Sequence, residues 1–177
     1  MRPSWALIAT SALFLLGCSS GGPEIVPPAE APTVTEASTK ATWNFEDHVT
    51  SLGVRFKWDD GLAMTVGPPK PFVPSRSAAR ENRFTTILAF VVKIDNETDK
   101  PYNPELAYCS GISGGEPMAP LIDSEKGIKG TPFGRVLPGK SVSYKVAFEV
   151  ADRRDIQVTC STGFEYGDIT WTTGEYP

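Results

Sequence analysis

The chain has 177 residues, with 17 Lys and Arg against 21 Asp and Glu, and a formal net charge of −4 at pH 7. This mild acidity argues against a nucleic-acid-binding protein, which would need a clustered basic face. It also argues against electrostatic docking to anionic lipid, and we interpret the net charge mainly as a contribution to solubility.

The first residues are typical of a secretory signal peptide. Arg2 precedes an apolar stretch from Trp5 to Leu16, which is followed by the small residue Gly17. This stretch of about a dozen residues is shorter than the roughly 20 that a membrane-spanning helix needs. We therefore expect residues 1–17 to be a cleaved signal peptide.

The four residues from Leu15 to Cys18 resemble the lipobox of bacterial lipoproteins. The resemblance implies that the thiol of Cys18 receives a diacylglyceryl group and that Cys18 becomes the first residue of the mature protein. Two or more acyl chains are needed for stable membrane anchoring, which this modification supplies. The alternative is an ordinary secretory peptide in which Cys18 is incidental.

The next segment reads as a tether. Residues 19–42 are rich in Ser, Gly, Pro, Ala, Thr and Glu, contain no aromatic residue and carry only scattered aliphatic ones. Such a composition cannot bury enough apolar surface to offset the entropy of ordering. We expect residues 18–42 to comprise the lipidated cysteine and a disordered tether that holds a domain of residues 43–177 off the membrane.

The domain begins with a hairpin pattern and then a long apolar run. Asp59-Asp60-Gly61 separates strand candidates at 54–58 and 62–66, which is a hairpin signal. Residues 84–94 are apolar at both odd and even positions, which predicts a central strand. One helical turn is expected at 75–82, and the glycine-rich stretch 111–134 is expected to be mostly loop.

The second half continues the β pattern. In 141–150 the even positions are apolar, while Ser143, Lys145 and Glu149 fall on the other face, which predicts a half-buried strand. Further strand candidates lie at 105–112, 155–161 and 168–172. About seven short strands with turn signals between them predict an all-β, two-sheet antiparallel sandwich.

Two cysteines remain once Cys18 is set aside. Cys109 and Cys160 would lie in a compartment where disulfides persist, and two cysteines allow one pairing. A metal site or a reactive thiol is the alternative, but neither cysteine has a second Cys or a His within a few residues. We expect a disulfide.

A family resemblance supports the sandwich. It is carried by the lipobox, the tether and the turn and strand motifs Asp95–Pro101, Leu137–Ser141, Ile156–Val158 and Asp168–Trp171. Residues 50–173 resemble the telokin-like, immunoglobulin-like extracellular domains of actinobacterial lipoproteins, a family largely without assigned function and similar in fold to a secreted immunogenic antigen of mycobacteria. The resemblance implies an immunoglobulin-like β-sandwich and supplies no catalytic residues. The antibody-type pattern is absent, because Val158 stands where a tyrosine would precede the second cysteine.

The search for chemistry gives no active site. His48 is the sole histidine and sits at the junction of tether and domain, a poor place for a preorganised base. Asp95, Glu97 and Asp99 alternate as calcium ligands could, but the sixth and twelfth positions of an EF-hand loop would be Lys100 and Leu106. A different calcium-binding loop stays an alternative to a polar hairpin turn. We expect no catalytic, metal or cofactor residues.

Two segments are candidate binding surfaces, residues 68–83 and 111–134, because loops on rigid scaffolds tend to carry function. The first contains four prolines in a polyproline-like stretch, which could present Phe72 beside three arginines. We favour the alternative, a rigid crossover between sheets with Phe72 and Val73 packed inward.

These features predict a membrane-anchored extracytoplasmic lipoprotein whose non-enzymatic sandwich binds a protein or envelope partner and no nucleic acid. The alternative is a small-molecule or ion-binding envelope lipoprotein, which a concave apolar pocket would favour.

Overall fold

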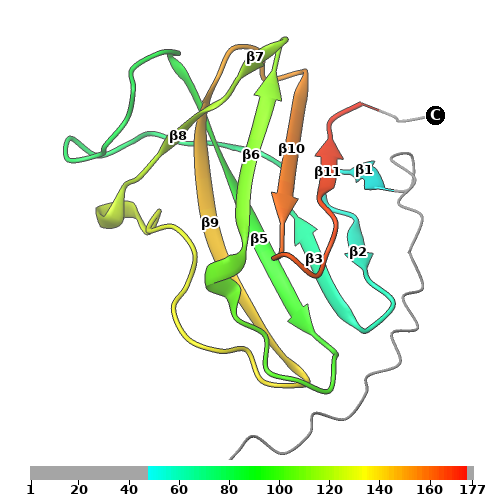
Figure 1. Ribbon diagram of the computed structural model, residues 1–177. Coiled ribbons are helices and arrows are strands. Elements are labelled where there is room, and N and C mark those ends of the chain that lie inside the picture. Colours follow the sequence, from blue (N-terminus) through cyan, green and yellow to red (C-terminus); the bar gives the residue numbers. More distant parts are fainter. Residues whose placement is uncertain (1–47, 175–177) are drawn as a thin grey trace, which may run out of the picture. The chain divides into compact units, whose positions relative to one another are not determined.

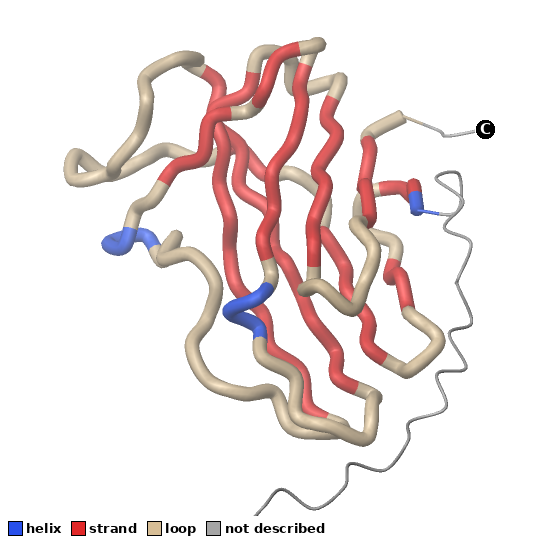
Figure 2. The backbone as a smooth tube through the Cα atoms, viewed as in Figure 1, coloured by secondary structure: helices blue, strands red, loops and turns tan. Residues whose placement is uncertain are grey.

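The computed structural model describes residues 48–174 (Figures 1 and 2). The predicted signal peptide, Cys18, the tether and the boundary between residues 42 and 43 lie outside the described residues. Within residues 48–174, no helix is long and apolar enough to cross a membrane. The strands in this range are β1 Val49–Ser51, β2 Arg55–Lys57, β3 Leu62–Val66, β4 Lys70–Pro71, β5 Thr86–Asn96, β6 Tyr108–Ser113, β7 Glu116–Pro117, β8 Ala119–Leu121, β9 Lys140–Val150, β10 Ile156–Ser161 and β11 Ile169–Thr172.

The strands form two sheets that pack face to face, which confirms the predicted sandwich (Figure 1). One sheet has the order β1-β11-β10-β6-β7, and the other has the order β2-β3-β5-β9-β8 with β4 beside β5. Between them lies a core that includes Phe90, Leu62 and Trp171, all essentially inaccessible to solvent. All pairs are antiparallel except β1 with β11. These two strands are far apart in sequence, so no hairpin fixes their relative direction.

The long strands β5 and β9 pair along their whole length, from Thr86 opposite Val150 to Asn96 opposite Lys140. The even-numbered apolar residues of β5 face the other sheet. Its odd-numbered Ile87 and Ala89 face outward, where Phe72, Leu121, Ile128 and Ala147 complete a second, smaller apolar cluster. This cover on the outer face explains why residues 84–94 are apolar at both odd and even positions.

The predicted helical turn at 75–82 is wrong. Ala79 instead forms an isolated bridge with Ile122, and Asn82 has a positive φ of 60°. Nearby backbone N–H groups donate to carboxylates from distant segments: Ser75 donates to Asp123, and Asn82 donates to Glu149. Such side-chain acceptors offer the backbone an alternative to helical hydrogen bonds.

The expectation of mostly loop at 111–134 holds only in part. This segment supplies β7 at the edge of one sheet and β8 at the edge of the other. Pro117 and Pro120 lie in these strands, and edge strands tolerate proline because they need fewer backbone donors. The strand expected at 105–112 begins later, since Pro104–Leu106 forms a 3-10 turn before β6.

The proline-rich segment matches neither interpretation in full. Residues 70–71 pair with β5 as β4, so the segment stays in one sheet and does not cross to the other. Phe72 packs against the outer apolar cluster, as the crossover interpretation expected for it, whereas Val73 is exposed.

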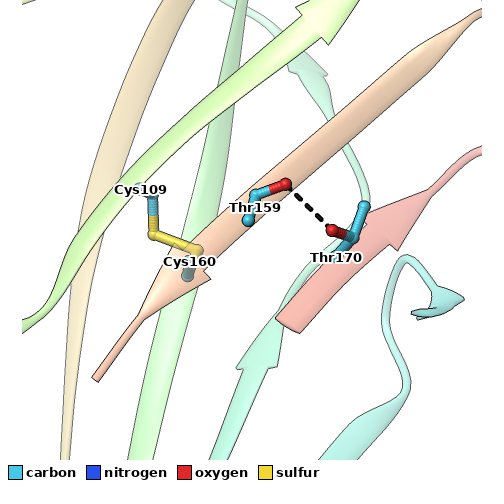
Figure 3. The surroundings of a disulfide bond; sticks show 4 residues. All are labelled: Cys109, Thr159, Cys160 and Thr170. Atoms are coloured by element: carbon cyan, nitrogen blue, oxygen red, sulfur yellow. Dashed lines mark hydrogen bonds between the residues drawn. A yellow bond between two sulfur atoms is a disulfide. The ribbon is translucent and has the colours of Figure 1, made fainter. Parts of the chain in front are cut away.

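The expected disulfide between Cys109 and Cys160 is present (Figure 3). The two residues stand directly opposite each other on β6 and β10, neighbouring strands of one sheet, and both side chains face the core. On the adjacent strand pair, the hydroxyls of Thr159 and Thr170 are hydrogen bonded at 2.9 Å. The disulfide therefore fixes β6 to β10 within a sheet, whereas an antibody-type disulfide joins the two sheets.

Candidate functional site

Three connections meet at one end of the sandwich, the lower end in Figure 1. They are the turn between β2 and β3, the segment that follows β5, and the segment between β10 and β11. Together with Arg135 of the segment between β8 and β9, they enclose a concave site of about 540 Å³, which we name the end groove. Its lining consists of Asp60, Thr98, Asp99, Lys100, Pro101, Tyr102, Asn103, Leu106, Arg135, Thr162, Gly163, Phe164, Glu165 and Tyr166.

A second concave site, the side hollow, adjoins the end groove and has a volume of about 460 Å³. The two share four lining residues, among them Leu106 and Phe164. The side hollow is completed by Glu105, Ser161 and Asp168. Phe164 therefore belongs to both concavities.

Phe164 is fully exposed, with a relative solvent accessibility of 103%. The preceding residue, Gly163, has a φ of +121° and lies so close to Leu106 that an added Cβ would contact that side chain. A glycine is favoured there because side chains rarely adopt this backbone conformation. The resulting loop holds a phenyl ring in water, an arrangement that typically marks an interaction surface when other apolar groups lie beside it.

Two tyrosines tie the end groove together. The Tyr166 hydroxyl donates to a carboxylate oxygen of Asp60 at 2.6 Å, which links the β10–β11 connection to the β2–β3 turn. The Tyr102 hydroxyl donates to the backbone carbonyl of Thr162 at 2.8 Å. Both rings pack edge to face, with Tyr166 5.3 Å from Trp58 and 6.5 Å from Tyr102. These hydrogen bonds and ring contacts therefore hold the three connections to one another.

Both tyrosines remain neutral hydrogen-bond donors over the ordinary pH range. Burial raises the pKa of Tyr166, and its hydrogen bond to Asp60 raises it further. Burial also raises the pKa of Tyr102. One polar group of the lining is unpartnered, because the buried Thr162 hydroxyl has no hydrogen-bond partner among the described residues.

The charges around Phe164 are mostly negative. The two concavities are lined by two cations, Lys100 and Arg135, and by the carboxylates of Asp60, Asp99, Glu105, Glu165 and Asp168. No ion pair within residues 48–174 includes any of these carboxylates. This end of the sandwich therefore presents unneutralised negative charge beside an exposed aromatic ring.

The possible calcium loop at 95–99 does not assemble. Asp95 pairs with Lys93 at 2.7 Å and with Arg55, while Glu97 pairs with Lys57 at 2.7 Å. Asp99 lines the end groove instead. Across residues 48–174, no group of three or more His, Cys, Asp and Glu side chains converges as metal ligands would. The remaining candidate base, His48, lies with its ring centroid 6.2 Å from that of Phe56 and outside the groove lining.

A third concavity, the side pocket, lies between β6 and β9 where β8 ends, and it has a volume of about 330 Å³. Its lining is mainly apolar and includes Ala107, Cys109, Leu121, Ile122, Ile128, Val146 and Phe148. Tyr144 also lines it, and burial raises the pKa of this tyrosine to about 12. The Tyr144 hydroxyl is buried without a hydrogen-bond partner among the described residues.

The two predicted binding segments contribute unequally to these sites. Residues from 111–134 supply part of the side pocket, whereas none from 68–83 lines the end groove, the side hollow or the side pocket. Sequence reasoning missed the end groove. Its signal was the segment Gly163-Phe164-Glu165-Tyr166-Gly167, in which two aromatic residues stand between glycines in a connection between strands.

Comparison with known proteins gives similarity in fold alone. No family profile matches the chain, and no curated protein matches it. Among solved structures, it is similar to the ycdA protein of Bacillus subtilis, described as a lipoprotein (17% identity, TM-score 0.49, 70% of this chain and 38% of that chain). It is also similar to the secreted protein MPT63 of Mycobacterium tuberculosis (12%, TM-score 0.47, 70% and 95%) and to a β-sandwich protein of Clostridium difficile (8%, TM-score 0.44, 71% and 93%).

The expected similarity in fold to a secreted mycobacterial protein is thus found. The matched region spans little more than a third of the Bacillus subtilis protein. Membership of the lipoprotein family stays a prediction, since no family profile matches.

Proposed function

We propose that this protein is a membrane-anchored extracytoplasmic lipoprotein whose β-sandwich is a non-enzymatic interaction module. The signal peptide and the lipobox ending at Cys18 support export and anchoring. The Cys109–Cys160 disulfide fits an oxidising compartment. His48, the sole histidine, lies outside the lining of the end groove and the side hollow.

The observation that carries the interaction role is Phe164, which is fully exposed over a groove whose tyrosines are held by hydrogen bonds. Covering such a ring removes apolar surface from water at roughly 25 cal/mol per Å². A site held in one arrangement before binding loses little conformational entropy when a partner docks. The end groove is therefore the binding surface of the module.

Anchoring is tested by the intact mass of the protein from the membrane fraction, for the natural chain and for Cys18→Ala. We expect a mass that carries the diacylglyceryl group, and its loss in the variant together with release from the membrane. An unmodified chain in the medium would contradict the anchor.

The interaction is tested in cells that produce the full-length chain with a photo-crosslinking phenylalanine analogue at position 164. The matched position is 73, where Val73 is also exposed but lies outside the lining of the concave sites. We expect a discrete crosslinked adduct from position 164 and none from position 73. Absence of an adduct at 164, or the same adduct from both positions, would contradict the proposal.

The side pocket favours a second candidate function, the binding of a small apolar molecule. Its volume of about 330 Å³ is at the lower end of the range for ligand sites. The test is titration with the dye N-phenyl-1-naphthylamine, for the natural chain and for Val146→Phe, which would reduce the pocket. Equal dye fluorescence in both would count against ligand binding there.

A further inference from the structure

The charges of the side hollow point to the chemistry of a partner. Its charged lining residues are Glu105 and Asp168, and no cation lines it. Glu105 accepts a long hydrogen bond of 3.3 Å from the backbone N–H of Gly134, and Asp168 forms no ion pair among residues 48–174. Because concave surfaces of one charge sign focus the electrostatic field, this hollow attracts cations from a distance.

The exposed ring of Phe164 adds a second reason to expect a cation. Arg and Lys side chains bind the face of an aromatic ring within about 6 Å of its centroid, and carboxylates beside the ring strengthen the attraction. Phe164 has Glu165 next to it in sequence and lines the same hollow as Asp168. A guanidinium placed over the ring of Phe164 would contact the aromatic face and lie near these carboxylates at the same time.

The end groove supplies room for the rest of such a partner. It continues from Phe164 past Tyr166 to Asp99, and its lining includes the unpartnered Thr162 hydroxyl, which is fully buried. A polypeptide backbone brings both donors and acceptors that can satisfy such groups. The five carboxylates of the two concavities outnumber the two cations, Lys100 and Arg135, so the surface repels nucleic acid and anionic lipid.

We infer that the end groove and the side hollow dock a basic segment of a protein partner, with an Arg or Lys side chain seated on Phe164 between Glu165 and Asp168. This inference rests on the proposed function and specifies the kind of partner. Aromatic and Arg residues are the usual centres of binding energy in protein interfaces, and the groove pairs one with the other.

The test uses the purified full-length chain in neutral detergent and a capped oligoarginine peptide as the probe. Binding is followed by calorimetry and by tryptophan fluorescence, to which Trp58, packed against Tyr166 of the groove, contributes. Oligoglutamate, a neutral Gly-Ser peptide and a neutral oligosaccharide serve as comparison ligands. We expect the basic peptide alone to bind, with an affinity that falls as salt is raised.

Matched variants locate the binding. Phe164→Ala should weaken the affinity about tenfold or more, and Phe133→Ala, which removes another highly exposed ring outside both concavities, should leave it unchanged. Glu165→Gln should weaken it, whereas Glu81→Gln makes the same change of net charge at an exposed position elsewhere and should not. All four residues are on the surface, so folding should be preserved.

Three results would overturn the inference: equal losses in Glu165→Gln and Glu81→Gln, an unchanged affinity in Phe164→Ala, or preferential binding of a neutral or acidic ligand. The crosslinking experiment separates this failure from that of the proposed function. If position 164 still gives its adduct in cells while the basic peptide fails, the partner class is wrong and the interaction role stands. If both fail, the interaction role is wrong as well.

Discussion

The carboxylates on the outer face of the β5–β9 sheet differ sharply from those around the end groove. On the outer face, Asp95 and Glu97 lie within ion pairs, and Glu149 is wholly buried against its partners. Around the end groove, Glu165 and Asp168 are exposed and take part in no ion pair of the described region. A carboxylate thus stabilises the fold where groups of the same protein pair with it. Where no such group does, the carboxylate is available to a partner.

Glu149 illustrates how fully a carboxylate on the outer face is paired with donors of the same protein. Its carboxylate accepts hydrogen bonds from the backbone N–H groups of Asn82, Arg83 and Phe84 at 3.0, 2.5 and 3.0 Å. The Arg80 guanidinium lies 2.9 Å away. Burial by itself raises the pKa of Glu149, but these donors outweigh it and hold the pKa below its ordinary value.

The largest expected effect is that of Glu149→Ala. Because the variant leaves Arg80 and three backbone N–H groups without their acceptor, we expect the free energy of unfolding to fall by about 3–5 kcal/mol. Urea denaturation measures the loss. The matched change at the groove, Glu165→Ala, should cost less than about 0.5 kcal/mol. Similar losses in the two variants would refute the contrast between the regions.

The disulfide gives the next largest effect. It fixes β10 to β6, and β10 leads directly into the connection that carries Phe164. The double variant Cys109→Ser, Cys160→Ser should lose about 2–4 kcal/mol, mainly because the unfolded chain gains freedom. The measurement is urea denaturation against the oxidised natural chain. Coinciding unfolding curves would show that the bond contributes nothing to the scaffold of the groove.

Acid should destabilise the outer face. Burial raises the pKa of Asp95, but Lys93, Ser141 and Arg55 outweigh it and lower the pKa. For Asp95 and Glu149 the folded pKa lies below the unfolded values of 3.8 and 4.5. Their contribution to stability is therefore present above those values and is lost as the pH falls through the folded pKa.

The check is the melting temperature as a function of pH. We expect Asp95→Asn and Glu149→Gln each to flatten the acid side of the profile relative to the natural chain. Asp95→Asn is the milder change and guards against a Glu149→Gln chain that does not fold. Parallel profiles for all three proteins would show that these carboxylates titrate alike in the folded and unfolded states.

The smallest effect on stability is expected at the groove surface. Phe164→Ala removes a ring that has almost no packing in the folded state, so the free energy of unfolding should change by less than about 0.5 kcal/mol. Thermal and urea denaturation measure the change. A loss above about 1 kcal/mol would mean that the ring supports the fold, and would weaken its assignment to binding.

Most strands follow from local pattern. The alternation in 141–150 predicts β9 to within one residue, and 62–66 matches β3 at both ends. The same local reasoning misplaces Glu149, which the alternation assigns to solvent. The loop that covers Glu149 lies 65 or more positions earlier in the chain. No residue near Glu149 in the sequence indicates that its side chain is covered.

The end groove could be predicted only in part. Phe164 between turn residues is a signal that the sequence carries, but a lone phenylalanine in a connection is as compatible with packing as with exposure. Asp60 lies more than a hundred positions before its hydrogen-bond partner Tyr166. Nothing in the spacing of these residues predicts that they meet.

By itself, the sequence determined the β-sandwich, the single disulfide pairing and the expectation of export, because periodicity, cysteine number and the N-terminal pattern are local properties of the chain. The tertiary structure alone decided that Cys109 and Cys160 join neighbouring strands of one sheet, that Glu149 is buried, and that Phe164 stands over a negatively charged groove. Those features arise where distant segments meet. Their energies depend on which partners each side chain finds there, and no local pattern specifies those partners.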